Sequence, residues 1–148
     1  MLANFKKYMI TIFLTEDDRD DQQIFKDALD EIEISFLIAN FGNGEELLEH
    51  LDKNQDLLPD IIFLDLNMPI MNGIECLKIL KKNPKYKDLF VAIYSTSVSN
   101  DTIMEAFEAG ANTYIRKPSD FSKLKEILQE VFKDSWSDHF AASNLKTF

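Results

Sequence analysis

Acidic residues follow two apolar runs of the sequence, and together they could form a cation site. Glu16 and Asp17 come after the run 9–14, and Asp65 comes after the run 61–64. A carboxylate at the end of a buried strand must face a crevice, because burying its charge carries a large desolvation penalty. If the two runs are neighbouring parallel strands, the three carboxylates meet at one edge of the sheet. Their types and placement predict a site for a divalent metal ion and a phosphate group.

The elements that must position these acids are predicted by five alternations of an apolar run with a helical pattern. The expected strands lie at 9–14, 34–38, 61–64, 90–94 and 113–115. Most are nearly continuous in apolar residues, whereas 34–38 alternates, as expected of a strand near a sheet edge. The expected helices repeat apolar residues at helical spacing and lie at 24–32, 43–51, 72–82, 100–109 and 121–131. Continuous apolar strands are typical of a parallel sheet with helices on both faces. We therefore expect an α/β protein with a doubly wound sheet, which binds ligands beyond the carboxyl ends of its strands.

Three positions predict where helices begin or end. Asn43, with Glu46 three residues later, resembles a capping box before the second helix. Asn72 can cap the third helix, and Gly110 is placed to end the fourth.

Composition limits the classes of protein that this chain can represent. Its 148 residues, 45% of them hydrophobic, suit one globular domain with a substantial core. No apolar run approaches the roughly 20 residues that span a bilayer, and the first residues do not resemble an export signal. The net charge of −10 disfavours nucleic-acid binding. The single cysteine, Cys76, cannot form an internal disulfide, which suits the cytoplasm.

Four groups of residues carry a resemblance to a known family. They are Leu14–Asp18, Phe63–Gly73, Ile93–Ser95 and Ala109–Pro118. In this order and spacing they resemble the receiver domain of bacterial two-component response regulators. The resemblance covers roughly residues 8 to 133, so we expect a receiver domain at 1–133. The segment 134–148 is expected to be a short, frayed C-terminal tail, with no output domain.

The resemblance implies a flavodoxin-like sheet of five strands in the order 2-1-3-4-5, and it implies a metal site. Asp65 would be the phosphoacceptor. Asp17 would bind Mg²⁺ (or Mn²⁺) directly, as would Asp65, and Glu16 would act through a metal-bound water. Asn67 would offer its backbone carbonyl to the ion.

The resemblance also assigns roles to residues that follow the fourth and fifth strands. Ser95 would hydrogen-bond the phosphoryl group, and Lys117 would pair with it. Tyr114 would be the aromatic switch, turning inward as Ser95 moves toward the phosphoryl group. The Lys117–Pro118 peptide bond would be cis, as ordered cis bonds are almost always found before proline.

The function implied is that of a stand-alone response regulator rather than an enzyme. It would accept a phosphoryl group from a sensor histidine kinase or a histidine phosphotransfer protein and signal to a downstream protein through altered contacts. We expect it in the cytoplasm, with no nucleic-acid or membrane partner. It is similar to the single-domain regulators associated with phytochromes, which favours a homodimer through the fourth helix, fifth strand and fifth helix.

Two alternatives remain open from the sequence. A haloacid-dehalogenase-like phosphatase also uses an aspartate nucleophile and Mg²⁺, but it requires a second Asp where this chain has Asn67. The other alternative is a pseudo-receiver, a binding module that is never phosphorylated. Loss of the acids or the lysine would signal it, and Glu16, Asp17, Asp65 and Lys117 are all present.

Overall fold

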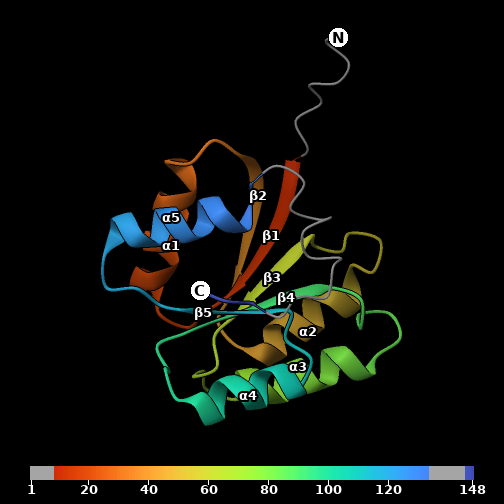
Figure 1. The fold of residues 1–148 in the computed structure, drawn as a ribbon. Coiled ribbons are helices and arrows are strands. Elements are labelled where there is room, and N and C mark those ends of the chain that lie inside the picture. Colours follow the sequence, from red (N-terminus) through yellow and green to blue (C-terminus); the bar gives the residue numbers. More distant parts are fainter. Residues whose placement is uncertain (1–8, 134–145) are drawn as a thin grey trace.

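A parallel sheet runs through the middle of the protein (Figure 1). The structure is a computed structural model that describes residues 9–133 and 146–148. The strands are β1 (Met9–Thr15), β2 (Ser35–Phe41), β3 (Ile61–Leu64), β4 (Phe90–Ser95), β5 (Thr113–Arg116) and β6 (Lys146–Thr147). The helices are α1 (Arg19–Asp30), α2 (Gly44–Lys53), α3 (Gly73–Lys82), α4 (Asn100–Glu108) and α5 (Phe121–Val131). The first five strands stand in the order β2-β1-β3-β4-β5, which confirms the predicted flavodoxin-like fold.

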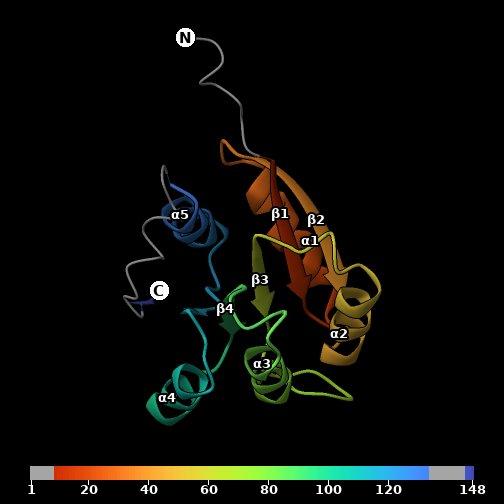
Figure 2. The ribbon, with the colours of Figure 1, turned by 90° about the vertical axis from the view of Figure 1, so that its right-hand side faces the viewer.

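Helices cover both faces of the sheet, as the continuous apolar strands predicted. Helices α1 and α5 lie on one face, and α2, α3 and α4 lie on the other (Figures 1 and 2). Successive residues of β3 alternate between two hydrophobic cores: Ile61 and Phe63 enter the core under α1 and α5, and Ile62 and Leu64 enter the other. Within the described residues, no helix has the length and apolarity that crossing a bilayer requires.

The predicted helix ends are mostly found as expected. Asn72 forms a full capping box with Glu75 at the start of α3. Asn43 accepts a hydrogen bond from the Glu46 amide at the start of α2. The Glu46 carboxylate, however, accepts from the Gly42 amide, so the reciprocal half of the expected box is shifted by one residue. Gly110 has a φ of +111°, a conformation that glycine adopts readily, and it follows Ala109, the C-cap of α4.

A sixth strand extends the sheet at its β5 edge, and the sequence did not predict it. β6 pairs in parallel with β5, with Thr113 opposite Lys146 and Tyr114 opposite Thr147. A frayed end therefore does not describe these last residues. The remainder of the expected tail, 134–145, lies outside the described residues. Pairing with β5 covers backbone groups that an edge strand would otherwise leave open.

Candidate functional site

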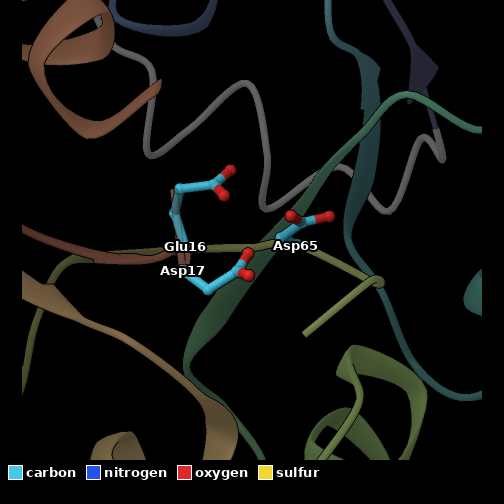
Figure 3. Close-up of side chains that lie close together, drawn as sticks. All are labelled: Glu16, Asp17 and Asp65. Atoms are coloured by element: carbon cyan, nitrogen blue, oxygen red, sulfur yellow. The ribbon is translucent and has the colours of Figure 1, made fainter. Parts of the chain in front are cut away.

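Three carboxylates meet where β1 and β3 end (Figure 3). The two strands are hydrogen-bonded neighbours, and Thr15 of β1 stands opposite Leu64 of β3. The next residues, Glu16 and Asp65, consequently leave the sheet at the same level. One carboxylate oxygen from each of Glu16, Asp17 and Asp65 lies within 4.8 Å of the others. Glu16 and Asp65 are buried and Asp17 is exposed, so the cluster opens to solvent on one side.

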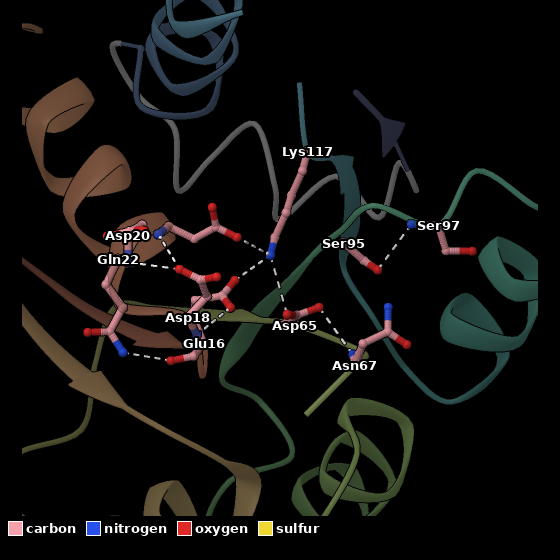
Figure 4. A network of polar contacts seen from close by, with 10 residues as sticks. Glu16, Asp18, Asp20, Gln22, Asp65, Asn67, Ser95, Ser97 and Lys117 are labelled. Atoms are coloured by element: carbon pink, nitrogen blue, oxygen red, sulfur yellow. Dashed lines mark hydrogen bonds and ion pairs between the residues drawn. The ribbon is translucent and has the colours of Figure 1, made fainter. Parts of the chain in front are cut away.

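The ammonium group of Lys117 lies among the acids (Figure 4). Its Nζ is 3.3 Å from Oδ2 of Asp65 and 3.1 Å from Oδ2 of Asp21, and it also forms an ion pair with Glu16. The same Nζ lies 5.2 Å from the centre of the Tyr94 ring, within the range of a cation–π interaction. Lys117 follows β5, so three strands contribute directly to this arrangement.

Backbone groups fix the orientation of the two buried carboxylates. The Asn67 amide donates to Oδ1 of Asp65 over 3.1 Å, which leaves Oδ2 facing Lys117. The Asp18 amide donates to Oε2 of Glu16 over 3.0 Å. The Gln22 side chain donates to the backbone carbonyl of Glu16 over 2.7 Å and ties α1 to the end of β1. These hydrogen bonds hold the acids in fixed orientations, and groups fixed in this way can stabilise charge without reorganising.

The pKa values of Glu16 and Lys117 are both raised in the site. Burial raises the pKa of Glu16 to about 7, although the hydrogen bonds from Lys117 and Asp18 act to lower it. Burial acts to lower the pKa of Lys117, but the hydrogen bond to Glu16 and the charge of Asp65 outweigh it, so the pKa is raised. Lys117 therefore stays protonated, and one ammonium group does not fully offset the surrounding carboxylates.

We predict that the protein without metal loses stability as the pH rises through neutrality. The pKa of Glu16 is about 7 when folded, against an ordinary value of 4.5, so the folded state holds a proton that the unfolded state releases. The stability that this proton contributes to the folded state is complete below about pH 4.5 and is lost as the pH rises through 7. Its largest slope is about 1.4 kcal/mol per pH unit. The prediction is tested by urea unfolding of wild type and Glu16→Gln at pH values between 4 and 9, with a chelator present.

The Glu16→Gln variant cannot titrate at this position and isolates the contribution of Glu16. The free energy of unfolding of wild type minus that of the variant should fall across this range. A difference that stays constant with pH would contradict the raised pKa of Glu16.

Ser95 and Tyr114 are linked to each other through Ser97. The hydroxyl of Ser95 accepts a hydrogen bond from the Ser97 amide over 3.3 Å, and the Tyr114 hydroxyl donates to the Ser97 carbonyl over 3.0 Å. Tyr114 is fully buried, and burial raises its pKa. The Tyr114 side chain thus lies inside the protein in this structure. Ser95 also accepts from the Lys117 amide through its backbone carbonyl, over 2.8 Å.

The Lys117–Pro118 peptide bond is trans, and the expectation of a cis bond is wrong for this structure. For X–Pro bonds the trans form is favoured by about 0.5–1 kcal/mol. With the trans bond, Lys117 already reaches Glu16 and Asp65, so its side chain is placed in the site without a cis bond.

The loop after Asp65 is closely packed and locally strained. Ile70 has a φ of +68°, and the Met71 amide donates to the Pro69 carbonyl over 2.7 Å, which makes a tight γ-turn. A branched residue in this conformation carries a strain of roughly 1–3 kcal/mol. Gly73 then begins α3 directly against Asp65: a Cβ atom there would lie 2.3 Å from the Asp65 carbonyl oxygen.

Replacing Gly73 with alanine should destabilise the protein and displace the loop. The added methyl group would meet backbone atoms of Asp65 and Leu66, which have little freedom to move aside. Overpacking of this kind costs about 1–3 kcal/mol, and we expect the upper part of that range. Urea unfolding of Gly73→Ala measures the loss, with Gly42→Ala as control because its Cβ would meet only the flexible Glu46 side chain. Equal stability of the two variants would contradict this packing.

The structure brings together the predicted residues Glu16, Asp17, Asp65, Asn67 and Lys117. It also adds contacts that were not predicted. No role in the site was predicted for Asp21, and it forms an ion pair with Lys117. Its position in the first turn of α1, shortly after the acids at the end of β1, was a usable signal. The contact of Tyr94 with Lys117 had no such signal, because it depends on how β4 and β5 are aligned.

The donor set fits a hard divalent cation. Mg²⁺ and Mn²⁺ prefer oxygen ligands, and three carboxylates within one coordination sphere would repel one another without a cation. The open side at Asp17 leaves room for water, which Mg²⁺ usually retains.

Fold and site together define a receiver domain, and comparison with known proteins agrees. Residues 12–129 match the response regulator receiver domain, and the chain belongs to this family. It is 36% identical over 89 residues to a chemotaxis protein CheY homolog of Campylobacter jejuni, covering 60% of this chain and 67% of that one. Receiver domains are signalling modules, so the family assignment excludes the phosphatase alternative.

Two solved structures of response regulators share the fold, and the first of them is a phytochrome response regulator. The phosphorylated cyanobacterial RcpA is 29% identical, with a TM-score of 0.78, over 86% of this chain and 96% of that one. The Mn²⁺-bound form of Rcp1 is 26% identical, with a TM-score of 0.74, over 82% of this chain and 91% of that one. The similarity to phytochrome regulators predicted from the sequence is confirmed at the level of structure.

Proposed function

We propose that Asp65 accepts a phosphoryl group from a sensor histidine kinase or a histidine phosphotransfer protein, and that the protein then signals through altered protein contacts. The observation that carries this proposal is the environment of Asp65. Its buried carboxylate lies beside Glu16, Asp17 and the ammonium group of Lys117. A solvated acid at the end of a strand would not need this arrangement.

The residues have distinct parts in the proposed transfer. A carboxylate oxygen of Asp65 attacks the phosphorus atom, the bond from phosphorus to the donor histidine breaks, and the product is an acyl phosphate. Lys117, held within 3.3 Å of Asp65, pairs with the phosphoryl oxygens. The Asn67 amide keeps Oδ1 of Asp65 in a fixed orientation during the attack.

A metal ion completes the charge balance of the proposed site. Asp17 and Asp65 would hold Mg²⁺ (or Mn²⁺) directly, with the backbone carbonyl of Asn67, and Glu16 would act through a bound water. The ion supplies neutralisation of the negative charge that the carboxylates and the phosphoryl group bring together. Glu16 must lose its proton for this role, so cation binding should strengthen as the pH rises through about 7.

The proposed response starts at Ser95 and reaches Tyr114. A phosphoryl group on Asp65 attracts the Ser95 hydroxyl, which now accepts from the Ser97 amide. Moving Ser95 changes the position of Ser97, whose carbonyl holds the Tyr114 hydroxyl. The surface of α4, β5 and α5 then differs between the two states, and a downstream protein can distinguish them.

The proposed setting is the cytoplasm, where histidine kinases present their phosphorylated residue. A homodimer through α4, β5 and α5 stays a prediction. β6 occupies the outer edge of β5, so a dimer of that kind must accommodate or displace Lys146–Thr147.

Phosphorylation with a small-molecule donor tests the proposal. The protein is incubated with acetyl phosphate and Mg²⁺, and its intact mass is measured by mass spectrometry. We expect a gain of one phosphoryl group that is absent when a chelator is added. A wild-type protein that stays unmodified with acetyl phosphate and with competent histidine kinases would instead support the pseudo-receiver alternative.

A further inference from the structure

Phe148, which directly follows β6, hydrogen-bonds the segment of β5 that leads into the acidic site. The Phe148 amide donates to the Tyr114 carbonyl over 2.7 Å, and the Arg116 amide donates to the Phe148 carbonyl over 3.1 Å. These two bonds bracket Ile115 and end one residue before Lys117. Both are made by the backbone, so they depend on the position of β5 itself.

The side chain of Phe148 anchors β6 on one face of the sheet. It is half-buried and packs against the core formed with α1 and α5, which includes Ile115. The neighbouring Thr147 is exposed. Docking of β6 therefore includes two backbone hydrogen bonds and the apolar contact of Phe148, and the two hydrogen bonds depend on the alignment of β5.

The same segment of β5 is held from the other side by the acidic site. Lys117 contacts Glu16 and Asp65 through its ammonium group, and its amide donates to the Ser95 carbonyl. Tyr114 contacts the Ser97 carbonyl through its hydroxyl. Residues 114–117 thus connect the carboxylates to β6 without any intervening element.

We propose that β6 is a regulatory strand, docked on β5 while Lys117 is bound by the carboxylates and released when a cation takes the place of Lys117. The inference rests on the proposed function of the acidic site. A cation held by Asp17 and Asp65, with Glu16 on its bound water, competes with Lys117 for the negative charge of Asp65 and Glu16, which loosens the end of β5. The Arg116 amide then loses its alignment with the Phe148 carbonyl.

Coupling of this kind acts equally in both directions. If an occupied site weakens the docking of β6, then weakening β6 must raise the affinity of the site for the cation by the same factor. This reciprocity gives two independent measurements.

The first measurement follows hydrogen exchange of the Phe148 amide in the full chain by NMR. The Asp60 amide, which donates to the Thr11 carbonyl at the far end of the sheet, serves as the internal reference. Saturating Mg²⁺ should speed exchange at Phe148 by about fivefold or more, with the Asp60 amide unchanged. Lys117→Met, measured without Mg²⁺, should speed it as well, because the link between β5 and the carboxylates is removed.

The second measurement compares Mg²⁺ affinity by calorimetry in Phe148→Ala and Thr147→Ala. The first variant removes the apolar anchor of β6, and the second alters an exposed side chain of the same strand. Phe148→Ala should bind Mg²⁺ about fivefold more tightly or better than wild type, and Thr147→Ala should match wild type.

The outcomes separate this inference from the proposed function. If wild type binds Mg²⁺ but exchange at Phe148 does not change, and the two variants have equal affinities, the inference is overturned and the function stands. If wild type binds no Mg²⁺, the proposed function fails, and the Lys117→Met comparison alone decides the inference. Unchanged exchange at Phe148 in Lys117→Met overturns it.

Discussion

Asp65→Asn should abolish phosphorylation completely, whichever donor is offered. The amide oxygen of asparagine is a poor nucleophile and forms no acyl phosphate, while the shape of the side chain is kept. Intact-mass spectrometry after incubation with acetyl phosphate and Mg²⁺ should show one phosphoryl group on wild type and none on the variant. The change removes a negative charge from a buried cluster of carboxylates, so the variant should remain folded.

The matched control for this experiment is Asp20→Asn. Asp20 is an exposed acid on the first turn of α1, close in sequence to the site acids, and its substitution changes the net charge by the same amount. We expect this variant to be phosphorylated like wild type. A phosphoryl group on Asp65→Asn would show that another residue is the acceptor.

Lys117→Met should slow phosphorylation by about 10²–10³-fold, the usual effect of removing one preorganised charge from a transition state. The ammonium group lies 3.3 Å from Asp65, and methionine keeps the apolar length of the side chain without the charge. The rate is measured from the time course of the mass shift. Lys78→Met, an exposed position on α3, is the control and should react like wild type.

The same variant should also be less stable, which provides a separate test of the ion pairs. Removing one partner of a buried ion pair typically costs about 3–5 kcal/mol. Lowering the pH should recover part of this loss, because protonated Glu16 no longer needs a cation beside it. Lys117→Arg keeps the charge and should recover most of the stability. If Lys117→Met matched wild type in both rate and stability, the proposed role of Lys117 would be wrong.

Local patterns in the sequence determined the elements and their order. The run 61–64 is buried on both faces and became β3 with the predicted bounds. Asn72 ended up as a cap because its side chain satisfies an amide only three residues away. Such features depend on neighbours along the chain, and apolar periodicity shows which residues a sheet must bury. The convergence of Glu16, Asp17 and Asp65 followed from one further step, namely that the carboxyl ends of parallel strands share an edge.

Contacts between residues far apart in sequence were decided by the tertiary structure alone. The placement of Lys117 over the Tyr94 ring requires the register of β4 against β5, which no local pattern encodes. The strand β6 contains only two residues and no periodicity, and it exists because β5 offers an open edge with free backbone groups. The sequence thus determined which chemical groups this receiver domain carries and at which end of the sheet they lie. Packing determined which of them touch, because the free energy of those contacts depends on distances that only the folded chain sets.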